Sequence, residues 1–142
     1  YDVAHTSGLD VVGTMVVSEN GQFNKSEYRK FKMSVDRNND LAGLTELLTR
    51  RFNHSEWSFP DLVVVDGGNK QYEIAVNILK ARRIDLPVVA VTKNDKHKAS
   101  SLIGNPDLIE KHKEAIIAIN AEAHRFSIKY HRQRRTKSFG LN

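Results

Sequence analysis

The chain contains no cysteine among its 142 residues, which excludes a disulfide framework and a cysteine-ligated zinc site. It has no apolar run of the roughly 18 residues that a membrane-spanning helix needs. It also lacks the basic start and apolar middle of a signal peptide. No HExxH zinc pattern or GxSxG esterase motif occurs in it. These absences predict a soluble, cytoplasmic protein that does not act on a membrane.

The length suits one domain with a core of its own. Because Tyr1 opens an expected strand without a preceding methionine, we interpret residues 1–142 as one domain of a longer protein. The net charge of +5 is concentrated near the C-terminus. The basic side chains there are Arg125, Lys129, Arg132, Arg134, Arg135 and Lys137. They form either a solvated helix end, where cations are favourable, or a face that binds the phosphates of a nucleic acid.

Hydrophobic periodicity predicts both strands and helices. Strands are expected at 1–6, 11–18, 26–33, 62–66 and 87–93, and helices at 41–52, at 69–82 and from about 107 onward. Asn20-Gly21 predicts a type I′ hairpin turn, while residues 94–106 give no regular pattern. On the last helix an apolar face is expected at Ile109, His112, Ile116, Ile119, Ala123, Phe126 and Tyr130.

This order of elements is typical of an α/β protein in which a three-strand antiparallel meander joins parallel strand–helix units. We therefore expect a ribonuclease H-like fold, with a mixed five-stranded sheet of three antiparallel and two parallel strands, flanked by helices. In that arrangement the first and fourth strands are parallel neighbours. Acidic residues on these two strands would then lie side by side at the sheet edge where ligands bind.

Two aspartates occupy those strands. Asp2 lies within YDVAHT, and Asp66 ends the apolar strand LVVVD before Gly67-Gly68. A buried carboxylate is costly unless a cation or hydrogen bonds compensate it, and carboxylates are preferred ligands of Mg²⁺ and Mn²⁺. A metal-dependent phosphodiesterase fits this pattern. The structural alternatives are a hydrogen-bonded aspartate at position 2 and plain Asp-Gly turn chemistry at position 66.

Two further residues have comparable alternatives. Asp40 directly precedes a helix, where it acts either as an N-cap or as a third acidic group at the metal. His124, in EAHRF, lies just beside the apolar face of the last helix. It is either a packing residue or a catalytic group that transfers a proton, positions water or ligates the metal.

The segments YDVAHTSG, VVGTMVV, YRKFKM, LLTRRF, PDLVVVDGGNKQ, PVVAVTK and EAHRFSIKYHRQRR follow one another along nearly the whole chain. In this order they resemble the C-terminal endonuclease domain of UvrC, the nuclease subunit of bacterial nucleotide excision repair. The combination of DGG with EAHRF and YHR is specific to that family. Three departures occur. Asn39-Asp40-Leu41 replaces a pair of acids followed by tyrosine, Asn120-Ala121 replaces an Arg-Asp pair, and the segment from Asn94 to Lys111 lacks the usual Leu-Pro and Ser-Pro signals.

The resemblance implies a DNA endonuclease that uses Mg²⁺ or Mn²⁺ to cut damaged double-stranded DNA on the 5′ side of a lesion. Its catalytic positions fall on Asp2, Asp66, His124 and Asp40, with Asp2 and Asp66 as the metal ligands. Lys93 and Arg125 also match the family pattern. With the later basic residues Lys129, Arg132, Arg134 and Arg135, they are the expected DNA-binding set.

The implied partners are UvrB and the UvrA/UvrB damage-recognition system, reached through other parts of the full-length protein. Two other readings remain. One is a different ribonuclease H-like nuclease, such as an endonuclease V-like enzyme or a Holliday-junction resolvase. The other is a catalytically silent module that docks DNA or protein.

Overall fold

The computed structural model describes residues 1–5, 11–34, 39–96 and 98–138, without the side chains of residues 100 and 130–138.

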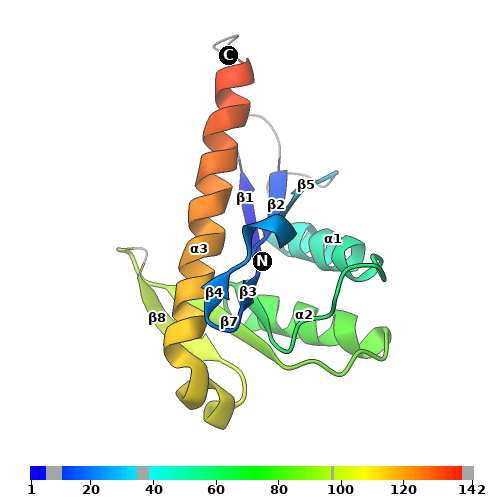
Figure 1. Cartoon of the computed structure of the whole chain (residues 1–142), viewed down its shortest axis with the longest axis vertical. Helices are drawn as coiled ribbons and strands as arrows, with labels where there is room; N and C mark the ends of the chain where they lie inside the picture. Colours follow the sequence, from blue (N-terminus) through cyan, green and yellow to red (C-terminus); the bar gives the residue numbers. More distant parts are fainter. Residues whose placement is uncertain (6–10, 35–38, 97, 139–142) are drawn as a thin grey trace.

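The first sheet is an antiparallel meander. β1 (Asp2–His5) pairs with β2 (Val11–Met15), and β2 pairs with β5 (Arg29–Lys32) (Figure 1). All of β2 is buried, which agrees with its central position and its apolar sequence.

A small hairpin separates β2 from β5. β3 (Ser18–Glu19) and β4 (Gln22–Phe23) pair across Asn20 and Gly21, whose φ angles are 52° and 80°. Both are positive, as a type I′ turn requires, so the predicted turn is confirmed. The expected continuous strands at 11–18 and 26–33 are shorter than predicted. The first ends at Met15, and the second begins only at Arg29, after a 3₁₀ turn, η1 (Lys25–Glu27).

The second sheet contains the parallel pair. β6 (Val63–Asp66) runs parallel to β7 (Val88–Lys93), and β8 (Ala99–Ile103) returns antiparallel to β7. The prediction that residues 94–106 are irregular was therefore wrong over Ala99–Ile103. β8 is an edge strand held by its backbone pairing with β7, and its mixed side chains, ASSLI, give no clear alternation for sequence reasoning to detect.

The expected single sheet of five strands is also not what the pairing shows. The described residues form two three-stranded sheets, β1-β2-β5 and β6-β7-β8, and the two-stranded ribbon β3-β4. Backbone hydrogen bonds nevertheless connect the two larger sheets. The Tyr1 nitrogen donates to the Val64 carbonyl (2.8 Å), and the Asp66 nitrogen donates to the Tyr1 carbonyl (3.2 Å). This is the bonding pattern of neighbouring parallel strands.

Helices cover both faces of these sheets. α1 (Asp40–Phe52) and α2 (Asn69–Ala81) pack together on one side, whereas α3 (Pro106–Ser138) crosses the other side and extends beyond it (Figure 1). Leu44 and Leu47 of α1 and Leu79 of α2 share one buried cluster with Val63 and Val65. Val64 instead packs with Ile116 of α3. Alternate residues of β6 thus face opposite layers, as strand geometry dictates.

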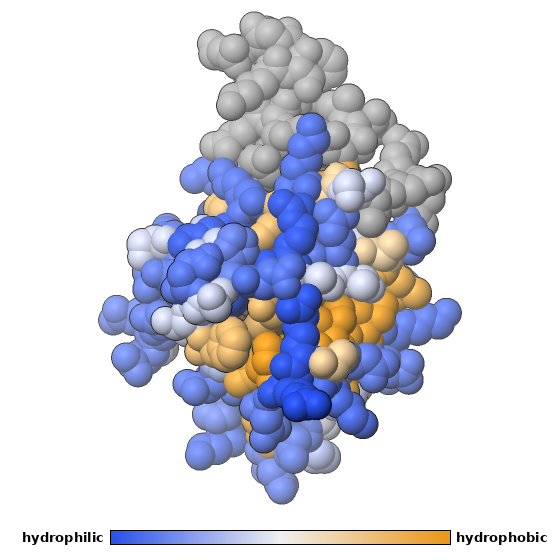
Figure 2. All heavy atoms as spheres, turned by 90° about the vertical axis from the view of Figure 1, so that its right-hand side faces the viewer, coloured by the Kyte–Doolittle hydropathy of each residue, from blue (hydrophilic) through white to orange (hydrophobic). Residues whose placement is uncertain are grey.

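The predicted apolar face of α3 includes one residue that does not belong to it. Ile109 and Ile119 pack against the buried cluster of Ile116, as expected. Ile116 and Ala123 are buried, but His112 is exposed and has non-helical angles (φ −120°, ψ 18°). The helix is kinked there, so the spacing of three and four does not carry His112 onto the buried face. Hydrophilic side chains cover much of the face shown in Figure 2, where an apolar area reaches the surface at mid-height. No helix within the described residues is long and apolar enough to cross a membrane.

Candidate active site

The pairing of β1 with β6 sets Asp2 beside Asp66. Tyr1 bonds to the residues on either side of Val65, so it lies opposite Val65 and the next pair is Asp2 with Asp66. Neighbouring strands are about 4.8 Å apart. Because side chains alternate along a strand, both carboxylates face α3, on the same side as Val64. The two aspartates therefore occupy adjacent positions on the α3 side of the sheets.

Asp2 is nearly enclosed, with only 4% of its surface exposed. Thr14 lies opposite it on β2, and Oδ2 of Asp2 is 3.7 Å from Nδ1 of His124. Burial acts to raise the pKa of the Asp2 carboxyl group, but the interaction with His124 and the nearby Lys93 cation outweigh it and lower the pKa. Asp2 is thus held as a carboxylate in a largely dry position.

Asp66 is more open and has two donors on one oxygen. Its side chain is 32% exposed, and Nζ of Lys93, at the end of β7, is 2.5 Å from Oδ1. The amide of Asn120 on α3 donates to the same Oδ1 at 3.2 Å. Gly67, which follows with a φ of +133°, allows the chain to turn immediately into α2, and a Cβ there would collide with Gln71.

His124 faces this pair from α3. Its side chain is 43% exposed, and its interaction with Asp2 raises its pKa, against burial and the Lys93 charge. A partly exposed imidazole with a carboxylate on one ring nitrogen is suited to orienting water or transferring a proton. The structure therefore brings together four of the residues selected from sequence: Asp2, Asp66, His124 and Lys93.

Sequence reasoning missed the buried polar residues that support these groups. Asn120 and Ser127 of α3 are 5% and 1% exposed, and Thr14 of β2 is fully buried. The hydroxyl groups of Thr14 and Ser127 are 2.7 Å apart, next to Asp2. The available signal was spacing, because Asn120, His124 and Ser127 are four and three residues apart and so share one helix face. That polar face turns toward the two aspartates.

The family model described as the UvrC RNase H endonuclease domain matches residues 1–128. The chain belongs to this family. Its Asp2, Asp66 and His124 all lie within the matched region, as does Asn120.

Curated relatives of this UvrC endonuclease domain carry the name UvrABC system protein C. One from Caldicellulosiruptor saccharolyticus is 39% identical over 145 residues, covering 96% of this chain and 24% of that protein. One from Clostridium perfringens is 38% identical over 161 residues (96% and 26%). One from Lachnospira eligens is 38% identical over 156 residues (97% and 26%). The chain thus spans about a quarter of the length of the curated relatives it matches.

Asp40 does not join the two aspartates. It contacts Nε2 of His5 at the opposite end of β1 from Asp2. The expected N-cap role is also wrong, because Asn39 caps α1 by accepting a hydrogen bond from the Ala42 nitrogen at 3.0 Å. Asp40 is instead the first residue of the helix, where an acidic side chain is favourable next to the positive end of the helix dipole.

The basic residues of this UvrC domain differ in their surroundings. Lys93 pairs with Asp66, and Arg125 pairs with Glu122 through Nε (2.6 Å) and Nη2 (2.9 Å). Lys129 is exposed on α3. The predicted DNA contacts Arg132, Arg134 and Arg135 lie on the part of α3 that extends past the sheets (Figure 1), but their side chains lie outside the described residues.

Glu122 connects α3 to the meander. It is 7% exposed and accepts hydrogen bonds from Arg125 and from the hydroxyl of Tyr28 (2.7 Å). The Arg125 bonds outweigh burial and lower the pKa of Glu122, whereas burial and the contact with Glu122 raise the pKa of Tyr28. Glu122 is therefore negatively charged and connects α3 to Tyr28, which directly precedes β5.

We expect Glu122→Gln to lower the free energy of unfolding by about 1 kcal/mol at pH 7, because it weakens charge-assisted hydrogen bonds. The folded-state pKa of Glu122 is lowered, so its contribution is present above the pKa of an unfolded glutamate and is lost as the pH falls through the folded value. The free energies of unfolding of parent and variant, measured with urea, should thus converge as the pH is lowered from 7 to 3. Glu114→Gln, an exposed change on the same helix, should not alter the free energy of unfolding. If the difference between parent and Glu122→Gln were the same at every pH, this role of Glu122 would be contradicted.

Asp2 and Asp66 are the residues that could hold a divalent cation. Among the described residues, no group of three or more acidic or histidine side chains is close enough to form a full ligand set. Mg²⁺, however, commonly binds through one or two carboxylates and completes its shell with water and substrate phosphates. Within the described part of the chain no donor contacts Oδ2 of Asp66. Two adjacent carboxylates with an open oxygen fit such an ion.

Proposed function

We propose that this UvrC domain is a Mg²⁺- or Mn²⁺-dependent DNA endonuclease that makes the 5′ incision beside a lesion in nucleotide excision repair. One observation carries the proposal. Asp2 and Asp66 occupy opposite positions on two neighbouring parallel strands, under a histidine of α3 that contacts Asp2 at 3.7 Å. The family to which the chain belongs is described as an endonuclease domain, which agrees with this arrangement.

Each residue has a separate task in this proposal. Asp2 and Asp66 hold the cation, which when bound polarises a phosphodiester and makes its water ligand more acidic. Asp2 is fixed by burial and by its contact with His124, whereas Asp66 is more open to solvent. His124 positions the attacking water or moves a proton to or from it. Asp40 contacts His5 at the other end of β1, so this proposal assigns it no share in holding the cation.

We also propose where DNA lies. The same helix that carries His124 continues through Lys129, Arg132, Arg134 and Arg135. A DNA duplex with one phosphate near the aspartates would therefore have further phosphates of its backbone near these residues. Such contacts bind backbone charge and carry no sequence information. Lesion recognition would then belong to UvrA and UvrB, which the rest of the full-length protein contacts. Arg125, already neutralised by Glu122, contributes less than the others.

The proposal is tested by incision of a defined substrate panel. Full-length UvrC carrying this domain is combined with UvrA and UvrB on a duplex with one bulky lesion, a duplex with a deaminated base, and a Holliday junction. We expect a cut on the 5′ side of the bulky lesion only, which requires Mg²⁺ or Mn²⁺ and stops with EDTA. Cutting of the other two substrates would support a different ribonuclease H-like nuclease, and absence of all cutting would support a docking module.

A further inference from the structure

The two oxygens of Asp66 have different surroundings. Oδ1 receives both the ammonium of Lys93 at 2.5 Å and the amide of Asn120 at 3.2 Å. A carboxylate oxygen offers about two lone-pair directions, so Oδ1 is fully used. Oδ2 contacts no donor within the described residues. Asp66 is therefore arranged to offer a single oxygen to a cation.

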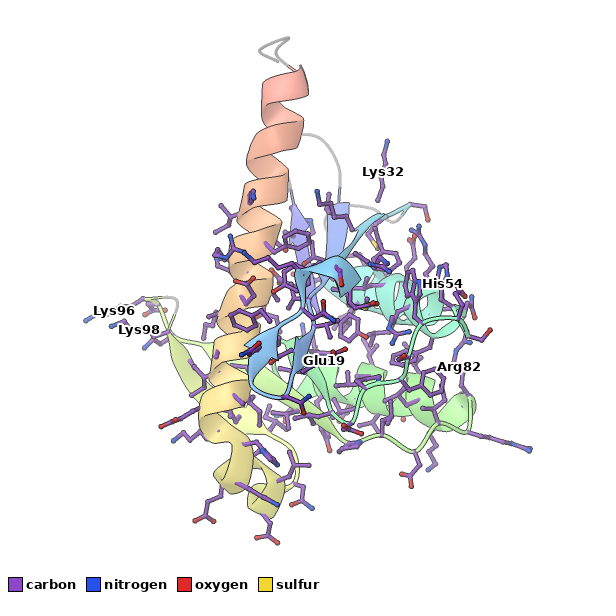
Figure 3. All side chains as sticks on the ribbon, in the orientation of Figure 1. Glu19, Lys32, His54, Arg82, Lys96 and Lys98 are labelled. Carbon is purple, nitrogen blue, oxygen red and sulfur yellow. The ribbon has the colours of Figure 1, made fainter. Side chains whose placement is uncertain are left out.

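Lys93 is held in this position by its strand. Val91 lies opposite Asp66 in the parallel pairing of β6 with β7. Lys93 follows an irregularity in the strand between Thr92 and Lys93, and its Nζ reaches Oδ1 of Asp66. Its side chain is only 16% exposed and forms an ion pair with Asp66, and its charge also acts on Asp2. By contrast, Lys96 and Lys98 point outward at the tip of the β7–β8 hairpin (Figure 3). Lys93 thus keeps a positive charge inside the candidate site.

We propose that the Lys93 ammonium is a built-in second cation of this site, an inference that rests on the proposed metal role of Asp2 and Asp66. It shares Asp66 with the divalent ion, limits the site to one ion, and supplies its charge to the phosphate of the bound DNA. A fixed ammonium beside a divalent ion has two opposite effects. It repels the ion, and it attracts the phosphate that must approach both.

The repulsion is large enough to measure. A single positive charge about 5 Å from a divalent ion lowers the affinity of the site for that ion by about tenfold even at the dielectric constant of water, and by more in a partly buried site. Removing the charge of Lys93 should therefore tighten metal binding, although it also removes a donor from Asp66. A residue that only supported the fold would have the opposite effect, since its loss would loosen the site.

The test is Mn²⁺ binding to this chain, followed by electron paramagnetic resonance of the free ion. We expect Lys93→Met to lower the Kd for Mn²⁺ at least about tenfold, and Lys93→Arg, which keeps the charge, to stay within about threefold of the parent. Lys96→Met removes an exposed lysine of the same hairpin and should leave the Kd unchanged. Equal or weaker binding by Lys93→Met, or tightening by Lys93→Arg, would overturn the inference.

A second measurement separates this inference from the proposed function. In full-length UvrC at saturating Mn²⁺, Lys93→Met should slow 5′ incision at least about tenfold despite its tighter metal binding, because the phosphate loses a cation. An unchanged rate would overturn the role of Lys93 toward the phosphate. No Mn²⁺ binding by either the parent or the variant would overturn the metal site itself, whereas equal Kd values would overturn only the role of Lys93.

Discussion

Mn²⁺ should raise the melting temperature of this UvrC domain, and Asp66→Asn should abolish the increase. A ligand that binds only the folded state at 100 times its Kd stabilises that state by about 2.7 kcal/mol. For a domain of this size that corresponds to a shift of about 10 °C. Asp66 is the more exposed carboxylate of the pair, at 32% against 5% for the Asp2 side chain, so its replacement by a neutral amide should remove the binding energy. Differential scanning calorimetry with and without Mn²⁺ measures the shift.

The control for Asp66→Asn is Asp61→Asn, an exposed aspartate that precedes the same strand. It changes the charge equally but lies away from Asp2, so it should retain the full Mn²⁺ shift. Each variant is compared with itself, because Asp66→Asn also removes the partner of Lys93 and can lower the melting temperature without metal. If Asp66→Asn retained the shift, the ion would bind elsewhere on the chain.

His124→Ala should reduce 5′ incision by about 10² to 10⁴, the usual contribution of a positioned acid or base, while changing stability little. The side chain of His124 is 43% exposed and contacts Asp2 at 3.7 Å, so its removal leaves no large cavity. The measurement is the incision rate of full-length UvrC under single-turnover conditions, together with urea unfolding of this chain.

Two variants on the same helix are the controls for His124→Ala. His112→Ala removes an exposed histidine at the kink and should change neither rate nor stability. Ile116→Ala truncates a residue that is 1% exposed and should cost about 2 to 5 kcal/mol of stability. If His124→Ala lost stability as Ile116→Ala does but still cut DNA, His124 would be a packing residue.

The local chemistry of the site could be predicted because it follows from strand and turn patterns. Asp66 ends an apolar strand and precedes two glycines, a pattern visible in the sequence alone. The helix that carries His124 was likewise expected from its apolar spacing. Asp40 could not be assigned this way, because both Asn39 and Asp40 are good helix caps and the sequence does not specify which of them accepts the bond from Ala42.

The sequence by itself determined the three helices and the position of most strands, β8 excepted, and it placed Asp2, Asp66 and His124 among the candidates for catalysis. These properties depend on local periodicity and on side-chain chemistry, both of which a linear pattern contains. Only the tertiary structure decided that β8 pairs with β7, that Tyr1 connects the two sheets, and that Lys93 and Asn120 both bind one oxygen of Asp66. The bond of Tyr1 to Val64 and the two contacts of Asp66 join residues 27 to 63 positions apart. They form because packing the two layers of helices fixes the distance and direction between groups that no local pattern relates.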